Sequence, residues 1–456
     1  MTQSKHTVWL WVFCGLLVSA SGASFVQAGF LYVLNDVNGG PNQLYGYGVN
    51  EADGTLTLLS GFPMTTGGNG SQNLMCQRMC FDPAHARLYV INGGSNTLSA
   101  YSVNLDNGSL TPMPFSPLTL PPGPADPVNR WAWAAVAVHP SGSPLVVARD
   151  QLDQAVEPGQ LASFVITAST AALSADSPCF VGNGVFPYAL AFSRDGTSVY
   201  TGGNRATTLF AGFGVNATTG ALNPLPGSPF TSDGHWPLAY ATDGRGRLFM
   251  YSYHNQTVGQ SEAYTLAAGV PTAVSGNPFV SGLDDGIFGI RHPAGYYMVV
   301  DRTYSRVGVF RITGAGAGTL LTAVAGSPFQ AGGMGSTAMA LSRAGTHLFV
   351  ANTGHRNVTT FAVNPSTGVL TNLRTQPQNT LGAGGYLTGI AYAAPPLLGD
   401  LNLDGAVDAI DAELLARLLA DSLVETEIPA SWNGDMNADG LLDVLDLALL
   451  ELFIGL

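Results

Sequence analysis

Residues 338–377 read AMALSRAGTHLFVANTGHRNVTTFAVNPSTGVLTNLRTQP and contain apolar segments separated by turns. The turns AGTH (344–347), TGHRN (353–357) and PSTG (365–368) carry the Gly, Asn and Pro residues that commonly connect hairpin strands. Apolar and polar residues alternate between the turns, which is the pattern of half-buried β-strands. This stretch therefore predicts a four-stranded antiparallel sheet.

The same unit recurs about every fifty residues between residues 29 and 396. An apolar strand marks each unit: FLYVLN (30–35), RLYVIN (87–92), PLVVAR (144–149), SVYTGG (198–203), RLFMYS (247–252), YYMVVD (296–301) and HLFVAN (347–352). A proline lies near the end of each unit: Pro63, Pro117, Pro178, Pro229, Pro278, Pro328 and Pro377. Because proline lacks a backbone N–H, we expect it on the free outer edge of each sheet. The repeat predicts an all-β, seven-bladed β-propeller rather than a β-solenoid or a pair of sandwiches.

The two ends of the repeat region predict how the ring closes. FLYVLN corresponds to the second strand of a unit, whereas TGIAYA (388–393), after the seventh unit, corresponds to a first strand. Pairing of these two segments would complete the first sheet and join the ends of the ring.

The N-terminus has the features of a secretory signal. Lys5 and His6 precede the apolar run VWLWVFCGLLVSA (8–20), and VQA (26–28) offers small residues for cleavage. The run is shorter than the roughly 18 residues needed to span a bilayer. We therefore predict a signal peptide over 1–28, with a retained anchor helix as the alternative. The mature chain would be secreted, extracellular or periplasmic, with no membrane span.

Cysteines and histidines in the body allow limited predictions. Cleavage would leave three cysteines, Cys76, Cys80 and Cys179. An export compartment permits a disulfide within CQRMC (76–80), and three buried thiols are the alternative. Several histidines fall in turns beside strands and are predicted to be solvated: His85, His139, His292 and His347.

An acidic pattern occurs twice near the C-terminus, in DLNLDGAVDAID (400–411) and DMNADGLLDVLD (435–446). Asp or Asn occupies loop positions 1, 3, 5, 9 and 12, and Gly occupies position 6, which is the EF-hand calcium-loop spacing. Position 7 would contribute a backbone carbonyl. We predict two Ca²⁺ ions, held by Asp400, Asn402, Asp404, Ala406, Asp408, Asp411, Asp435, Asn437, Asp439, Leu441, Asp443 and Asp446. A solvated acidic tail is the alternative, but leucines at helical spacing follow each loop.

No helix pattern precedes either loop, and position 12 is Asp rather than Glu. The duplicated loop-then-helix unit resembles a type I dockerin over residues 399–456. The resemblance implies a small all-α domain and a cohesin-type partner, contacted by residues at loop positions 10 and 11. These residues are Ala409, Ile410, Val444 and Leu445. The weaker alternative is that the module packs on its own propeller.

The predicted domains are thus a propeller over 29–394, a linker over 395–398 and a dockerin-like domain over 399–456. The repeats, with LYVIN, LFVAN and FGVNATTGALNPLPGSPF, resemble YVTN-type propellers and the seven-bladed lactonase family that includes 6-phosphogluconolactonase-type enzymes. That family usually carries a histidine-containing motif before a first strand. The matching stretch here, DPVNRWAWAAVAVHPSG (126–142), has Arg130, Trp131 and Trp133 at the expected histidine positions.

Loops at one end of a propeller converge on its channel and supply candidate site residues. Lactone hydrolysis needs a base for water and a donor for the developing oxyanion. The catalytic candidates are His235, Asp284, Asp285 and Arg302. The ligand-binding candidates are Arg130, Trp131, Trp133, Arg149 and Trp236. The alternative is ordinary loop polarity, with tryptophans filling gaps between blades.

Charge is distributed unevenly between the two predicted domains. Residues from 399 onward carry 13 acidic groups and one arginine, whereas residues 1–398 carry 17 acidic and 16 basic groups. Neither part is basic, which argues against nucleic-acid binding. The leading hypothesis is a secreted propeller that binds a carbohydrate-like or protein ligand and docks through its calcium module. The alternative is a secreted lactonase-like or polysaccharide-degrading hydrolase that carries the same module.

Overall fold

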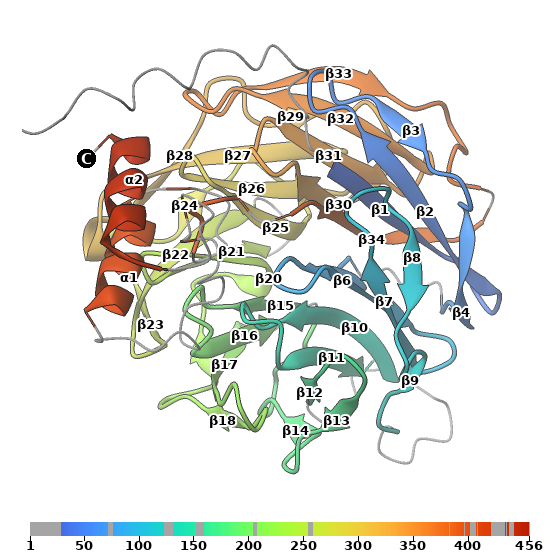
Figure 1. Ribbon diagram of the computed structural model, residues 1–456, viewed down its shortest axis with the longest axis horizontal. Helices are drawn as coiled ribbons and strands as arrows, with labels where there is room; N and C mark the ends of the chain where they lie inside the picture. Colours follow the sequence, from blue (N-terminus) through green and yellow to red (C-terminus); the bar gives the residue numbers. More distant parts are fainter. Residues whose placement is uncertain are drawn as a thin grey trace, which may run out of the picture.

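Seven antiparallel sheets surround a central axis in the computed structural model (Figure 1). The structure describes residues 29–71, 76–122, 131–151, 159–203, 208–253, 259–382, 384–395, 397–401, 407, 409–420, 434, 436 and 442–455, without the side chains of 131, 132 and 151. The predicted seven-bladed propeller is confirmed.

The blades are numbered in chain order. Blade 1 contains β1 (Gly29–Asp36), β2 (Pro41–Val49), β3 (Leu56–Leu58), β4 (Met64–Asn69) and β34 (Tyr386–Ala393), and blade 2 contains β5 (Met79–Asp82), β6 (Arg87–Asn92), β7 (Thr97–Val103), β8 (Leu110–Pro112) and β9 (Leu118–Thr119). Blade 3 contains β10 (Trp131–Val138), β11 (Leu145–Gln151), β12 (Gln160–Ile166), β13 (Ala171–Leu173) and β14 (Cys179–Phe180), and blade 4 contains β15 (Ala189–Phe192), β16 (Ser198–Gly202), β17 (Leu209–Val215), β18 (Leu222–Pro224) and β19 (Phe230–Thr231).

Blade 5 contains β20 (His235–Asp243), β21 (Arg247–Tyr253), β22 (Gln260–Ala267), β23 (Val270–Ala273) and β24 (Phe279–Val280). Blade 6 contains β25 (Gly286–His292), β26 (Tyr296–Asp301), β27 (Arg306–Thr313), the 3₁₀ turn η1 (Gly316–Gly318), β28 (Leu320–Ala323) and β29 (Phe329–Gln330). Blade 7 contains β30 (Ser336–Leu341), β31 (His347–Asn352), β32 (Asn357–Val363) and β33 (Leu370–Thr375).

The ring closes as predicted. Strand β34 pairs antiparallel with β1, with Val33 opposite Ile390. The innermost strands also touch in sequence around the channel, and β34 lies between β30 of blade 7 and β5 of blade 2. The last strand of the repeat region therefore completes the first blade.

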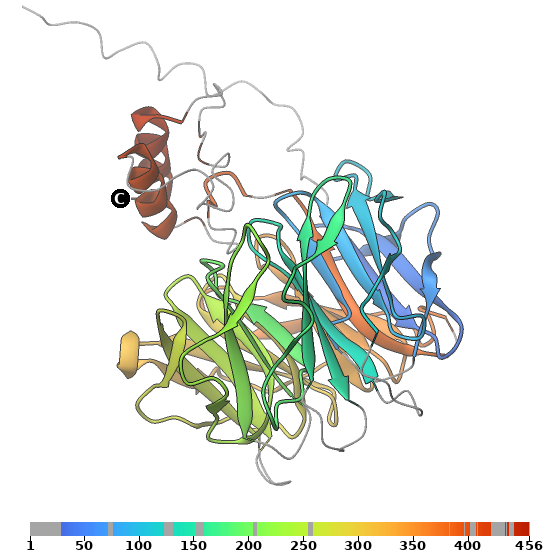
Figure 2. The same cartoon turned by 90° about the horizontal axis from the view of Figure 1, so that it is seen from below.

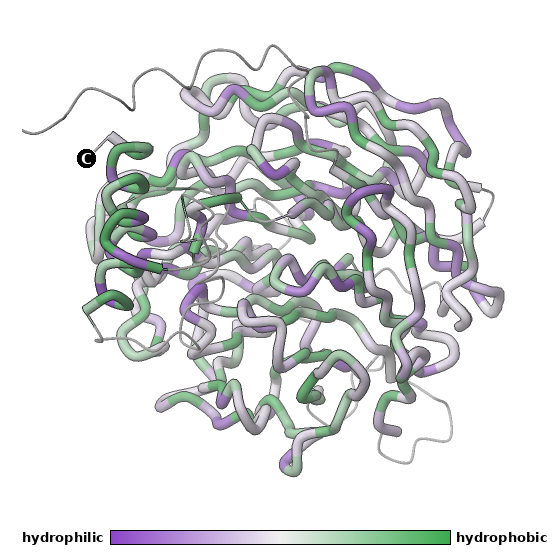
Figure 3. Tube along the Cα trace, viewed as in Figure 1, coloured by the Kyte–Doolittle hydropathy of each residue, from purple (hydrophilic) through white to green (hydrophobic). Residues whose placement is uncertain are grey.

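Second strands are buried on both faces because each blade packs between two neighbours. All six residues of β6 are buried, and so are all six of β31. One core cluster, for example, joins Tyr89 and Ile91 of blade 2 to Val136 of blade 3. Figure 3 shows hydrophobic stretches along the strands and along both C-terminal helices. This double burial explains the apolar strand in each repeat.

Prolines lie at the outer edge, as predicted, and in blades 1 to 6 they lie inside a split outermost strand. In blade 3, β13 and β14 both pair with β12, and Pro178 lies between them. The side-chain oxygen of Ser177 accepts a hydrogen bond from the backbone N–H of Ser163 at 2.8 Å, where a continuous edge strand would supply a carbonyl. The same bond recurs in blades 2, 4, 5 and 6. In blade 7 the outermost strand β33 is unbroken, Pro377 follows it, and Gln376 Oε1 accepts the N–H of Val358 near the start of β32.

We call the face where the innermost strands begin the upper face, and the opposite face the lower face.

Four histidines of the lower face were predicted to be solvated, and this prediction is wrong for three of them. The side chain of His85 is 43% exposed, whereas His139, His292 and His347 are buried. Each of the first two buried rings links neighbouring blades: His292 Nε2 lies 2.8 Å from the carbonyl oxygen of Gly345, and His139 hydrogen-bonds the backbone of Gly196.

Helices α1 (Ala409–Leu419) and α2 (Val444–Ile454) form a separate small unit outside the ring (Figure 2). Leu415 of α1 and Leu450 of α2 are fully buried in a core that they share with Leu401 and Ala412. The predicted small all-α C-terminal unit is confirmed. Within the described chain, no helix is long and apolar enough to cross a membrane.

The buried lower-face histidines predict acid sensitivity. Burial lowers the pKa of His139 from 6.5 to about 4, so the folded ring stays neutral where the unfolded chain binds a proton. The free energy of unfolding should therefore fall by about 2 kcal/mol between pH 7 and pH 5 from this residue alone. Urea unfolding at both pH values should show that His139→Gln reduces this loss. Equal losses in the variant and the wild type would contradict the prediction.

Candidate functional site

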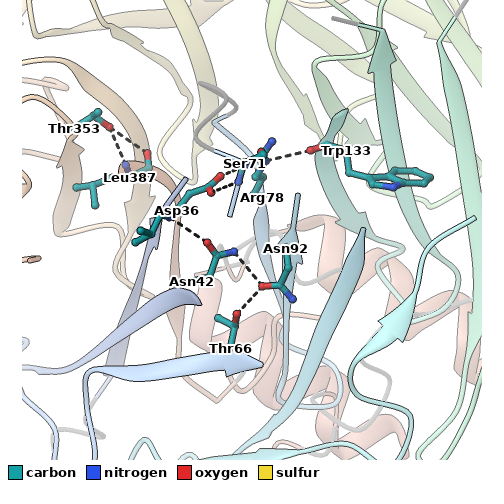
Figure 4. Close-up of polar contacts among 10 residues, drawn as sticks. Asp36, Asn42, Thr66, Ser71, Arg78, Asn92, Trp133, Thr353 and Leu387 are labelled. Atoms are coloured by element: carbon teal, nitrogen blue, oxygen red, sulfur yellow. Dashed lines mark hydrogen bonds and ion pairs between the residues drawn. The ribbon is translucent and has the colours of Figure 1, made fainter. Parts of the chain in front are cut away.

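The upper mouth of the ring is lined by buried polar residues from several blades. Asp36 at the end of β1 forms a fully buried ion pair with Arg78, which precedes β5 (Figure 4). Arg78 Nε also donates to the carbonyl oxygen of Trp133 at 3.1 Å, and Asp36 accepts the N–H of Ser71 at 2.8 Å. Blades 1, 2 and 3 are thus tied together at the mouth. Arg78 Nη2 is buried and has no hydrogen-bond partner in the part of the chain that the structure describes.

Amide side chains extend this network outward (Figure 4). Asn42 donates to Asn92 at 3.0 Å, and Asn92 in turn donates to Ser99 at 2.8 Å. On the far side of blade 1, the hydroxyl of Thr353 accepts the N–H of Leu387 at 3.0 Å. Each contact joins a strand end of one blade to a loop or strand end nearby, so the network fixes the loops around the channel.

Asp285 and Arg302 form the polar centre of blade 6. The guanidinium Nη2 of Arg302 lies 2.6 Å from Asp285 Oδ2, and Nε donates to the same oxygen at 2.7 Å. The Asp285 side chain is 15% exposed and that of Arg302 is 40% exposed. Burial raises the pKa of the Asp285 carboxyl, against the opposing effect of Arg302. Beneath the pair, the buried carboxylate of Asp301 accepts the N–H groups of Asp284 and Asp285.

Cys76 and Tyr188, which precede the first strands of blades 2 and 4, contact each other. The sulfur of Cys76 lies 3.4 Å from the hydroxyl of Tyr188, and both side chains are buried. Charges on Asp285 and Arg302 influence the pKa of both groups, which places all four residues close together. Burial raises the pKa of Cys76 to about 12, so its thiol is protonated near neutral pH and is a poor nucleophile.

Blade 5 contributes an aromatic pair. Trp236 and Tyr253 stack with ring centroids 5.0 Å apart and an interplanar angle of 20°. Trp236 is partly exposed and has a positive φ of 54°. The preceding loop is held by the buried carboxylate of Glu262, which accepts the N–H groups of Asp233 and Gly234 at 3.1 Å each. Desolvation, followed by the charges of Asp284 and Asp285, raises the pKa of Tyr253, so the rings lie near these two carboxylates.

The structure brings some predicted site residues together and separates others. His235 and Trp236 begin β20, which packs against β25, and Asp284 and Asp285 lie directly before β25. Trp133 is instead fully buried between blades 2 and 3, with the Arg149 guanidinium 4.8 Å from its ring centroid. Neither face of this indole is open to a ligand, and the pair fills a gap between blades. Arg130 lies outside the described residues, as does the Trp131 side chain.

Sequence reasoning missed Asp36, Cys76, Arg78 and Tyr188. A signal for Asp36 existed, because a polar residue ends the second strand of most repeats, as in RLYVIN and YYMVVD. The other three precede first strands, where the repeats share no common residue type. None of the three cysteines of the described chain forms a disulfide.

In both acidic loops, the last carboxylate accepts a hydrogen bond from a backbone N–H near the start of the same loop. The position-12 carboxylate of Asp411 accepts the N–H of Leu401 at 2.9 Å, and that of Asp446 accepts the N–H of Met436 at 2.8 Å. Asp400, Asp411 and Asp446 are at most 3% exposed. Buried carboxylates require compensating positive charge or donors, which fits a divalent cation in each loop.

Most of the predicted ligands lie outside the described residues: Asn402, Asp404, Ala406, Asp408, Asp435, Asn437, Asp439 and Leu441. In the remaining, described residues no group of three His, Cys, Asp or Glu side chains is close enough to hold a metal. Asp443 caps α2 by accepting the N–H of Leu445 at 2.7 Å.

Predicted docking residues lie at the start of each helix. Val444 is 76% exposed and Leu445 is 53% exposed, and Leu452 and Phe453 continue the apolar surface along α2. On α1, Ala409 is exposed, whereas Ile410 is half-buried. The second helix therefore presents the larger accessible apolar surface.

The buried Asp36–Arg78 pair predicts a large stability effect. Asp36→Asn would leave the Arg78 guanidinium buried without its countercharge, so the propeller should lose about 3–5 kcal/mol of unfolding free energy. Asp53→Asn is the matched control, because Asp53 pairs with Arg374 at 3.5 Å on the exposed surface. Denaturant titration should show little change for the control. Equal midpoints for the two variants would contradict the prediction.

Two family models match the chain. Residues 29–233 match the family described as "Lactonase, 7-bladed beta-propeller", and residues 398–454 match the "Dockerin type I domain". No curated protein sequence matches the chain.

Solved structures share the ring at low sequence identity. Two proteins assigned as 6-phosphogluconolactonases are similar: one from Bacteroides fragilis (16% identity, TM-score 0.60, 82% of this chain and 99% of that chain) and one from Bacteroides uniformis (12%, 0.62, 80% and 100%). The periplasmic gluconolactonase of Pseudomonas aeruginosa is also similar (17%, 0.55, 81% and 100%). At these identities the likeness shows the fold alone. The chain therefore combines a seven-bladed propeller, whose residues 29–233 are similar to the lactonase family, with a C-terminal module similar to type I dockerins.

Proposed function

We propose that this chain is a secreted propeller protein that binds a carbohydrate-like or protein ligand at the upper mouth and docks through its calcium module to a cohesin-type partner. The observation that carries the ligand proposal is the Trp236–Tyr253 stack beside the Asp285–Arg302 pair. An aromatic face next to paired polar groups suits a sugar ring, whose C–H faces are apolar and whose hydroxyls are donors and acceptors.

Docking rests on the second module. The match to the type I dockerin model supports a cohesin-type partner. Calcium would be held by the two acidic loops and would supply the positive charge that lets their carboxylates fold together. The exposed Val444 and Leu445 would then contact the partner.

Lactone hydrolysis is the second candidate, and the Asp285 environment favours it. Burial raises the pKa of this carboxyl, which strengthens it as a base for water, and Arg302 offers N–H donors beside it. His235 begins the adjacent blade and is the further candidate base.

The mouth proposal is tested by saccharide binding. Trp236→Ala should weaken binding by up to about tenfold, because a stacked aromatic contact contributes roughly 0.5–1.5 kcal/mol. Phe180→Ala on the outer edge, where Phe180 is 52% exposed, is the control and should bind as the wild type does. Glycan-array signals followed by titration calorimetry measure both. Equal affinity of Trp236→Ala and wild type would contradict the proposal.

The same samples separate binding from hydrolysis. Sugar lactones are incubated with wild type, Asp285→Asn and His235→Ala. Turnover above the buffer rate that falls in Asp285→Asn or His235→Ala supports the hydrolase. Rates equal to the buffer rate in all three proteins contradict it.

Calcium dependence gives a further prediction. Chelation should remove the helical circular-dichroism signal of residues 399–456 and leave the sheet signal of the propeller, because metal-binding energy is folding energy for such a module. Asp411→Asn removes one loop carboxylate and should weaken one of two calcium sites by about tenfold or more. Calorimetric titration of the full chain measures both sites. An unchanged helical signal in excess chelator would contradict the proposal.

A further inference from the structure

The lower mouth of the ring encloses a cavity that the upper-mouth function does not use. Two adjoining cavities of about 440 Å³ each open there. They share six lining residues: Phe81, Pro83, Arg194, Ile290, Arg291 and Leu341. Blades 2, 4, 6 and 7 contribute these residues, so the two cavities adjoin across the channel, and we call them together the lower space.

Gln77 lines the first of these cavities and hydrogen-bonds a strand of another blade. Its Nε2 donates to the carbonyl oxygen of Leu190 at 2.8 Å, and its Oε1 accepts the N–H of Leu190 at 2.9 Å. Gln77 lies in blade 2 and Leu190 in blade 4, which are not neighbours in the ring. The paired bonds therefore cross part of the channel, and Gln77 forms one wall of the lower space.

Positive charge converges on the lower space. Arg194 and Arg291 line both cavities, and Arg343 lines the second. Arg291 Nη2 donates to the carbonyl oxygen of Pro293 at 3.3 Å. Among the described lining residues Asp400 is the one carboxylate, and its charge acts on Arg343. Guanidinium groups gathered in a concave site with apolar walls focus a positive potential there.

Three further carboxylates on the same face have other partners. Asp82 lies 3.1 Å from His85, Asp243 lies 2.6 Å from Arg247, and Asp195 accepts the hydroxyl of Ser193 at 2.6 Å. None of the three lines the two cavities.

Apolar side chains form the rest of the shared lining. Phe81, Ile290 and Leu341 come from three different innermost strands and lie beside Arg194 and Arg291. The volume is in the range of small-molecule sites. An arginine fork matches the two oxygens of a carboxylate, and the apolar wall would exclude water from an attached hydrocarbon group.

We propose that the lower mouth is a second ligand site, which takes a small organic carboxylate with an apolar body. Arg194 and Arg291 hold the carboxylate, and Phe81, Ile290 and Leu341 contact the body. This site is independent of the ligand proposed for the upper mouth.

Calorimetric titration of the full chain with benzoate, acetate and inorganic phosphate tests the site. Benzoate should bind saturably with one site per chain, and acetate should bind at least about tenfold more weakly because it lacks the apolar body. Arg291→Gln and Arg194→Gln should each weaken benzoate binding by about tenfold, since each removes a charged hydrogen-bond donor. Arg245→Gln is the matched control, because Arg245 is exposed in the equivalent turn of blade 5 and lines neither cavity.

Several outcomes would overturn the proposal. They are the absence of saturable benzoate binding, phosphate binding as tight as benzoate binding, or equal losses in Arg245→Gln and Arg291→Gln. Trp236→Ala at the upper mouth should bind benzoate as the wild type does, so a loss in that variant would place benzoate at the upper mouth instead. Circular dichroism of each variant checks that it is folded. Because Arg194→Gln and Arg291→Gln change the same proposed site, both variants should weaken benzoate binding.

Discussion

Pairing of β34 with β1 is the contact on which the rest of the ring depends. Each blade carries apolar residues on both faces, so a blade is stable only between two covered neighbours. Closure supplies the missing neighbour for blade 1 and brings β30, β34 and β5 together around the channel. The two mouths exist because of that closure. A stack of the same sheets left open would expose two apolar blade faces and would have no channel.

Charged side chains are scarce in this chain, and many of those in the ring lie at strand ends facing the mouths. Only 10% of residues are charged. Asp36, Arg78 and Asp301 are buried and hold loops of the upper face by direct contacts. Burying a carboxylate is costly unless donors surround it, so these residues restrict the loops to one arrangement. Because these loops are fixed, the aromatic and charged side chains that they carry at the upper mouth are also held in place.

The repeat predicted what depends on position within a blade, namely the strands, the edge prolines and the closing strand. It did not predict what joins one blade to the next. His139 and His292 were expected to be solvated, but each hydrogen-bonds the following blade, a contact with a partner about fifty residues away. Trp133 fails as a ligand-facing residue for the same reason, because blade 2 covers it. By contrast, the calcium-loop pattern can be read from sequence spacing alone, since all ligands of one loop lie within twelve residues, and the ligation itself stays a prediction.

Asp400 connects the two modules physically. It is the first residue of the first acidic loop, it lines the lower cavity, and its charge acts on Arg343 of blade 7. Its backbone N–H also donates to the carbonyl oxygen of Leu397 at 3.0 Å, which turns the chain directly after the ring. The acidic module therefore begins at the arginine-bearing mouth rather than at the end of a long tether. Opposite charges meet where the two modules join, whereas the apolar residues along α2 stay exposed.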